Sequence, residues 1–199
     1  MFIIGLAGGI GSGKSTVASI LRDLGAVVFD TDQLIREAYG PGGELTRLVA
    51  ELLGPDTVAA DGSADRAKIA AMIFADEEVR RQINALIHPW VAARWRTLVQ
   101  QAEAQGARVA VIEGALYADK STGFDQLWVV VVDREIALQR ATQRGGLTRQ
   151  QAEARMATQL PPDQHAKLAD VVVDTRGSLD EVRKRVSDLW QQHIALAVQ

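Results

Sequence analysis

A run of eight residues near the N-terminus, Gly8-Gly9-Ile10-Gly11-Ser12-Gly13-Lys14-Ser15, has a composition suited to holding phosphate. Its glycines allow successive backbone N–H groups to converge on phosphate oxygens, because no Cβ atom stands in the way. Lys14 is placed to reach the β- and γ-phosphates of a nucleotide, and the Ser15 hydroxyl to complete the shell of a Mg²⁺ ion. The alternative is a flexible glycine turn without a ligand. The run predicts a binding site for a nucleoside triphosphate.

The segments around this run predict the elements that must position it. An apolar segment at residues 2–7 predicts a buried strand before the glycines, and a helix is expected to begin near Lys14. Helical segments alternate with further short β-branched runs, which predict strands at residues 26–30, 109–113, 128–133 and 170–174. This order predicts an α/β protein with a parallel five-stranded sheet in the three-layer arrangement of P-loop NTPases.

Two helical segments interrupt the alternation of strands and helices. Residues 33–106 contain no convincing strand and predict an inserted helical substrate lobe, and residues 140–167 predict a helical lid. We therefore expect one domain over 1–199, and its core is assigned to about 1–32, 107–139 and 168–199. Within the lobe, His88-Pro89 is expected to interrupt a long helical stretch, with Pro89 starting a new segment.

Acidic residues follow two of the predicted strands. Asp30 and Asp32 come at the end of the second strand, at the carboxyl edge where open α/β sheets bind ligands. A carboxylate there accepts the proton of an attacking hydroxyl or positions that hydroxyl, whereas the alternative is that Asp32 caps the following helix. Asp30 is open to a purely structural role. Glu113 ends the third strand and is either a Mg²⁺ site or a solvent-facing strand end.

Basic residues supply further candidates. Arg140 and Arg144 lie one helical turn apart in the predicted lid, and Arg155 follows there. Their guanidinium groups would neutralise charge on a transferring phosphoryl group, although arginines on a polar helix surface are common. His88 either contacts substrate or packs at the break in the helix.

Composition excludes several classes of protein. With a net charge of −3, broad non-specific binding of nucleic acid is not expected, and without cysteine neither disulfides nor thiolate metal sites can form. We expect no secretory signal and no membrane span, and the cytosol is the expected compartment. The sequence does not predict an oligomeric state.

Taken together, these motifs resemble the dephospho-CoA kinase family, and the resemblance runs nearly from end to end. It is carried by the phosphate-binding run, by Asp30-Thr31-Asp32 with Arg36-Glu37, and by Ile73-Phe74 and Ile87-His88-Pro89. Further matching segments are Arg140 with Arg144, Leu147-Thr148, Arg155 with Gln159, and Lys167-Leu168-Ala169-Asp170. Their order and spacing are specific, although each motif alone is short.

The resemblance implies an enzyme that transfers the γ-phosphoryl group of ATP to the ribose 3′-hydroxyl of dephospho-CoA, with Mg²⁺ present. It implies that Gly11, Ser12, Gly13, Lys14, Ser15 and Thr16 bind ATP. By the same resemblance Asp32 acts as base or positions the hydroxyl, and Arg140 and Arg144 contact phosphate or nucleotide. Of the other candidates, His88 would contact the acceptor, while Ser15 and Glu113 would serve the metal.

The chain departs from the family pattern in two places. Residues 115–119 lack the usual proline and end in Asp rather than Glu, which bears on the shape of the acceptor pocket. Thr175 stands where an asparagine is common, which bears on contacts with adenine. Three alternatives remain open: another small-metabolite or nucleoside kinase on the same core, a GTP-dependent switch, and a catalytically idle nucleotide-binding module.

Overall fold

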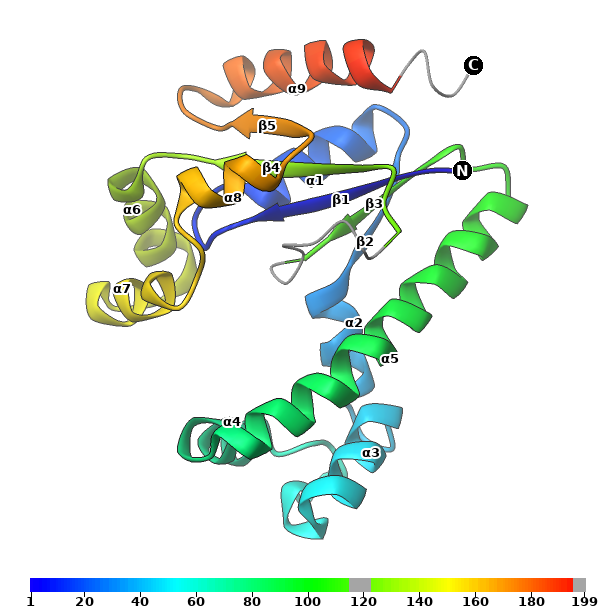
Figure 1. The fold of residues 1–199 in the computed structure, drawn as a ribbon, viewed down its shortest axis with the longest axis vertical. Coiled ribbons are helices and arrows are strands. Elements are labelled where there is room, and N and C mark those ends of the chain that lie inside the picture. The colour runs from blue at the N-terminus through cyan, green and yellow to red at the C-terminus, as the bar shows by residue number, and fades with distance from the viewer. Residues whose placement is uncertain (115–122, 195–199) are drawn as a thin grey trace. The chain divides into compact units, whose positions relative to one another are not determined.

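The computed structural model describes residues 1–114 and 123–194, with only the backbone of Arg144 and Gly145 (Figure 1). The chain divides into two compact units. The first, called the core unit here, comprises Met1–Phe29 and Val99–Gln199. The second, called the helical unit, comprises Asp30–Leu98. The departure at residues 115–119 lies outside the described residues.

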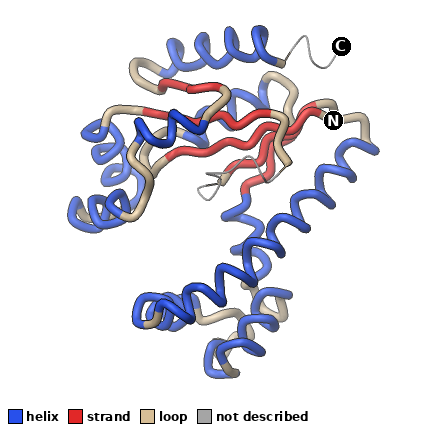
Figure 2. Tube along the Cα trace, in the orientation of Figure 1, coloured by secondary structure: helices blue, strands red, loops and turns tan. Residues whose placement is uncertain are grey.

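The core unit is built on a sheet of five described strands in the order β2-β3-β1-β4-β5. Figure 2 shows the strands of this sheet in red. The strands are β1 (Phe2–Gly8), β2 (Val27–Asp30), β3 (Val109–Glu113), β4 (Gln126–Val131) and β5 (Val171–Asp174). Parallel registers join β1 to β3 and β4, and β4 to β5. The predicted parallel sheet is confirmed, and its strand ends differ from the prediction by at most two residues. The strand that carries the glycine-rich loop lies in the middle of the sheet.

Two helices cover one face of the sheet in the core unit. Helices α1 (Lys14–Asp23) and α9 (Leu179–His193) pack against each other and against alternate strand residues such as Ile4, Val111 and Trp128. Because side chains of a strand alternate between faces, this set defines the α1/α9 face. Ala110, Ile112, Leu127 and Val129 point to the opposite face and are also buried. Burial on both faces explains the continuously apolar strand sequences.

Three helices follow β4 in the core unit: α6 (Arg134–Gly145), α7 (Arg149–Ala157) and α8 (Pro162–Leu168). A capping box begins α7, where the Thr148 hydroxyl accepts from the backbone of Gln151 and the Gln151 side chain accepts from the backbone of Thr148. The helical character predicted for 140–167 is therefore confirmed. Helix α6 begins at Arg134, before the predicted start of this segment. Strand β4 likewise ends at Val131, before its predicted end.

The helical unit contains α2 (Thr31–Ala38), α3 (Glu44–Leu53), a short 3₁₀ turn (Pro55–Thr57), α4 (Arg66–Ala75) and most of α5 (Glu77–Ala104). These elements pack around a separate cluster of apolar side chains that includes Leu45, Val49, Ile69 and Ile83. The expected helix break at His88-Pro89 is wrong, because α5 continues through Pro89. Proline removes one backbone donor, and the other bonds of this 28-residue helix keep it continuous. No helix of the described chain has the length and apolar character needed to cross a membrane.

Candidate active site

The glycine-rich loop joins β1 to α1 in the core unit. Two of its residues hold backbone conformations that favour glycine, with φ of 73° at Gly11 and 95° at Gly13. A Cβ atom on Gly11 would lie 2.0 Å from the carbonyl oxygen of Ala137, so the loop passes directly against α6. Gly13 precedes the first turn of α1, and this helix start leaves backbone N–H groups available to an anion. At Gly11, glycine is therefore required by close packing as well as by conformation.

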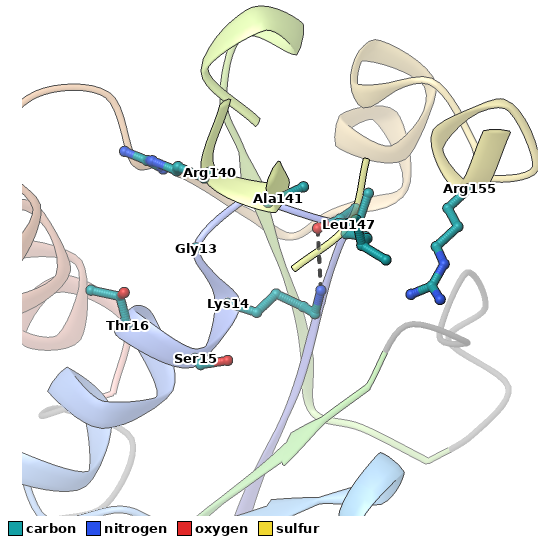
Figure 3. A pocket seen from close by; sticks show the side chains of 11 residues that line it. Gly13, Lys14, Ser15, Thr16, Arg140, Ala141, Leu147 and Arg155 are labelled. Carbon is teal, nitrogen blue, oxygen red and sulfur yellow. Dashed lines mark hydrogen bonds between the residues drawn. The ribbon is translucent and has the colours of Figure 1, made fainter. Parts of the chain in front are cut away.

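A cavity of about 300 Å³ lies along this loop (Figure 3). It is lined by Gly9, Ile10, Gly11, Gly13, Lys14, Ser15, Thr16, Arg140, Ala141, Leu147 and Arg155. Three cationic side chains and no acidic one occur among these described lining residues, so the cavity favours an anion. Figure 3 shows the side chains of Lys14 and Arg155 directed into the space between α1 and α7, with Arg140 extending away from Lys14. Five of the six predicted ATP-binding residues line the cavity.

Ser12 is the exception among the six. Its side chain is buried and faces an adjoining cavity of about 260 Å³ on the β4 and α8 side of the loop. His165 of α8 lines the same adjoining cavity. Burial lowers the pKa of His165, and the positive charge of Lys14 lowers it further. Both effects favour the neutral imidazole.

The Lys14 side chain folds back over the loop that precedes it. Its Nζ donates to the carbonyl oxygens of Gly8 at 2.7 Å and Gly9 at 3.3 Å. These carbonyls hold the ammonium group at the mouth of the loop, beside the backbone groups expected to receive phosphate. The position of Lys14 fits the predicted contact with β- and γ-phosphates.

Ser15 and Glu113, the two residues predicted to serve the metal, lie together. The Ser15 hydroxyl donates to Oε1 of Glu113 at 3.2 Å, although 98 positions separate the two residues. Glu113 is only 9% exposed, so the alternative of a solvent-facing strand end is wrong. A hydroxyl and a carboxylate are hard oxygen donors of the kind Mg²⁺ prefers, and few protein ligands suffice where phosphates and water complete the shell.

Arg140 of α6 is held by the residue that follows β5. Its Nη1 donates to the Thr175 hydroxyl at 3.0 Å, and its Nη2 donates to the Thr175 carbonyl oxygen at 2.9 Å. The Arg144 side chain lies outside the described part of the chain, so its predicted contact stays a prediction. Arg155 of α7 lines the cavity, as a lid arginine is expected to do.

The predicted residues Asp32 and His88 belong to the helical unit. Asp30, and not Asp32, caps α2: its Oδ1 accepts from the backbone N–H groups of Asp32 at 2.9 Å and Gln33 at 3.1 Å. The structural role left open for Asp30 is thus confirmed, and the capping alternative for Asp32 is wrong. Asp32 is exposed in the first turn of α2, and His88 is exposed on the continuous helix α5.

Sequence reasoning assigned no role to two residues that contact the loop. Gln159, which follows α7, accepts through Oε1 from the backbone N–H of Ile10 at 2.9 Å. Thr175 donates its hydroxyl to the carbonyl oxygen of Ser12 at 2.6 Å. The available signal for Thr175 was its place just after β5, at the carboxyl edge of the sheet. Gln159 was named only within a segment that resembles the family, and its contact with Ile10 could not be predicted because 149 positions separate the two residues.

The fold and the loop together define a class of protein. A glycine-rich loop joins the middle strand of a parallel sheet to a helix and borders a cavity lined by Lys14 and arginines, as in P-loop kinases.

Comparisons with known proteins identify the family within this class. The family model described as dephospho-CoA kinase matches residues 2–181. A dephospho-CoA kinase from Geobacter sulfurreducens is 41% identical over 192 residues, which cover 96% of this chain and 98% of the relative. The chain belongs to the dephospho-CoA kinase family, and it is an ATP-dependent kinase.

Solved structures agree with the fold. A crystal structure of a protein from Thermus thermophilus has a TM-score of 0.82 and 31% identity, with 98% of both chains covered. Dephospho-CoA kinase from Campylobacter jejuni has a TM-score of 0.63 and 20% identity, with 96% of both chains covered. At that lower identity the likeness concerns the fold alone.

Proposed function

We propose that the chain transfers the γ-phosphoryl group of ATP to the ribose 3′-hydroxyl of dephospho-CoA, giving coenzyme A and ADP. Family membership supports the substrate pair, and the observation that carries the chemistry is the cavity shared by the glycine-rich loop, Lys14, Arg140 and Arg155. In the proposed step a bond forms between the 3′-oxygen and the γ-phosphorus. The bond from that phosphorus to the bridging oxygen breaks, and ADP leaves.

The cavity is proposed to hold the triphosphate of ATP. Phosphoryl transfer through a loose transition state needs positioning and charge stabilisation more than covalent chemistry. The backbone N–H groups from Gly11 to Thr16 would orient the phosphates. Lys14 would contact the β- and γ-oxygens, and Arg140 with Arg155 would neutralise charge from the α6 and α7 side. Arg144 is proposed for the same role.

Ser15 and Glu113 are proposed to serve a Mg²⁺ ion bound with the nucleotide. When bound, this ion would supply positive charge that neutralises the phosphate oxygens of the nucleotide. The Ser15 hydroxyl is suited to direct coordination, and the buried Glu113 carboxylate is suited to orienting that hydroxyl or a water ligand of the ion.

The acceptor is assigned to the helical segment of about 33–106, and a closing lid to about 140–167. Asp32 is proposed to accept the proton of the 3′-hydroxyl or to align that hydroxyl for in-line attack. Asp32 is exposed in the first turn of α2 and is not the residue that caps this helix, which is compatible with the proposed role. His88, exposed on α5, is proposed to contact the acceptor.

The proposal is tested by comparing dephospho-CoA with its 3′-deoxy analogue at saturating ATP and Mg²⁺. We expect stoichiometric ADP release and one added phosphoryl group with dephospho-CoA, and neither product with the analogue beyond the rate without acceptor. Equal phosphorylation of both compounds would show that another hydroxyl is the acceptor. Phosphorylation of neither would contradict the assigned substrate.

A further inference from the structure

Thr175 is the residue at which three parts of the core unit meet. Its backbone N–H donates to the carbonyl oxygen of Val131 at 3.0 Å, which extends the pairing of β4 and β5 by one residue. Its hydroxyl contacts the glycine-rich loop at Ser12 and helix α6 at Arg140. The side chain is 2% exposed, so neither of these contacts is replaced easily by water. A fixed backbone and a buried hydroxyl make Thr175 a rigid anchor.

The hydrogen atom of this hydroxyl can be assigned from the distances. A hydroxyl has one hydrogen to donate, and the Ser12 carbonyl oxygen at 2.6 Å is much closer than that of Val131 at 3.4 Å. The hydroxyl therefore donates to Ser12 and accepts from Nη1 of Arg140 at 3.0 Å. The guanidinium charge polarises the hydroxyl and strengthens its donation to the loop. One oxygen atom thus links the cation to the loop backbone.

The contact with Ser12 also fixes the direction of the next backbone group. The peptide between Ser12 and Gly13 is trans, as are the other described peptides, so its C=O and its N–H point in opposite directions. Holding the Ser12 carbonyl toward Thr175 aims the Gly13 N–H away from it. Gly13 and Arg140 both line the 300 Å³ cavity. Thr175 therefore fixes both the Ser12–Gly13 peptide and the guanidinium of Arg140, and Gly13 and Arg140 are residues that border this cavity.

We infer that Thr175 is a positioning residue for ATP: its hydroxyl sets the Ser12–Gly13 peptide and the Arg140 guanidinium in the orientation that receives the phosphates. This inference rests on the proposed assignment of the cavity to ATP. It predicts that the hydroxyl matters more than the methyl group. Serine should replace threonine here, whereas valine, which has the same shape but neither donor nor acceptor, should not.

The test measures the dissociation constant of ATP and Mg²⁺ by titration, together with kcat and KM for ATP, in Thr175→Val and Thr175→Ser. We expect Thr175→Val to bind ATP about tenfold more weakly or worse, and Thr175→Ser to stay within about threefold of the wild type. Thr57→Val is the matched control, because Thr57 is 1% exposed, donates its hydroxyl to the Gly54 carbonyl oxygen, and is not among the residues that line the cavity. Its ATP affinity should not change.

A double-mutant cycle with Arg140→Ala separates positioning from general damage. If Thr175 acts partly through Arg140, Thr175→Val should weaken ATP binding by a smaller factor in the Arg140→Ala background. Thermal unfolding confirms that each variant is folded, and Thr175→Ala replaces the valine variant if that variant does not fold. Equal ATP affinity in the valine and serine variants would overturn the inference. Wild-type protein that binds ATP but fails to phosphorylate dephospho-CoA would contradict the proposed function instead.

Discussion

Replacing Gly11 with alanine perturbs the glycine-rich loop at its tightest point. The new Cβ would lie 2.0 Å from the Ala137 carbonyl oxygen, and contacts under 3.0 Å essentially never occur for real Cβ atoms. The obstacle is backbone of helix α6, which cannot rotate aside as a side chain can. The loop or the helix must therefore move by about 1 Å, and the backbone donors of the loop would move with it.

Two costs can be estimated for Gly11→Ala. A left-handed backbone, here φ of 73°, costs an alanine about 1–2 kcal/mol of stability. A displacement of about 1 Å in groups that position a reactant can cost about 10²-fold in rate, equivalent to about 2.7 kcal/mol in the barrier. We therefore expect kcat/KM for ATP to fall by about two orders of magnitude, beyond any loss of stability.

Gly25→Ala is the matched control for this experiment. Gly25 follows α1 with φ of 104°, and a Cβ there would meet nothing within 4 Å. This variant carries the conformational cost, about 1–2 kcal/mol, without the clash. The assay combines thermal unfolding with ATP titration and ADP release for both variants. If Gly11→Ala binds and turns over ATP as well as Gly25→Ala does, the close approach of loop and α6 does not organise the site.

Four further predictions concern single residues. Lys14→Ala should remain folded and lose at least about 10²-fold in turnover, measured by ADP release, because its charge is expected at the transferring phosphate. Glu113→Gln should raise the Mg²⁺ concentration needed for half-maximal activity by about 10- to 100-fold, and an unchanged Mg²⁺ titration would argue against its role. Asp32→Asn should lower kcat at least about 10²-fold, and wild-type turnover would remove the assignment as base while leaving the kinase activity in place. His165 has a folded-state pKa below its ordinary value of 6.5, so the unfolded chain binds its proton first as the pH falls. The free energy of unfolding should therefore decrease as the pH falls from 6.5 toward the folded-state pKa of His165. The variant His165→Phe should show a weaker dependence of the free energy of unfolding on pH in this range.

Local signals in the sequence predicted much of the fold. A capping box formed by Ser178 and Glu181 begins α9, and Val182 and Val186 lie on the buried face of this helix, one turn apart, which is the kind of local pattern that sequence shows. The apolar runs predicted the strands, and the glycine-rich run predicted the loop. Each of these patterns lies within a few consecutive residues, so it can be recognised in the sequence. The prediction of a helix break at Pro89 was wrong. The free-energy cost of one proline in a helix is local, and the remaining hydrogen bonds and buried residues of α5, such as Trp95, stabilise the helix by more than this cost.

Contacts between distant parts of the chain could not be predicted in the same way. The sequence analysis assigned Ser15 and Glu113 to the same metal ion, and the pairing of β1 with β3 explains how the fold brings them together. The link from Arg140 through Thr175 to Ser12 depends on α6, β5 and the loop converging at one edge of the sheet. The identity of the capping residue, Asp30 rather than Asp32, depended on where β2 ends. Such details follow from the folded backbone and not from composition or spacing.

The most direct test of the proposed function mixes purified protein with ATP, Mg²⁺ and dephospho-CoA, and follows ADP release and product mass. Adenosine, shikimate and gluconate serve as competing acceptors, and Lys14→Ala serves as the inactive control. We predict a single phosphoryl group added to dephospho-CoA and none to the competitors. Preferential phosphorylation of another acceptor, or tight ATP binding without transfer to dephospho-CoA, would contradict the account.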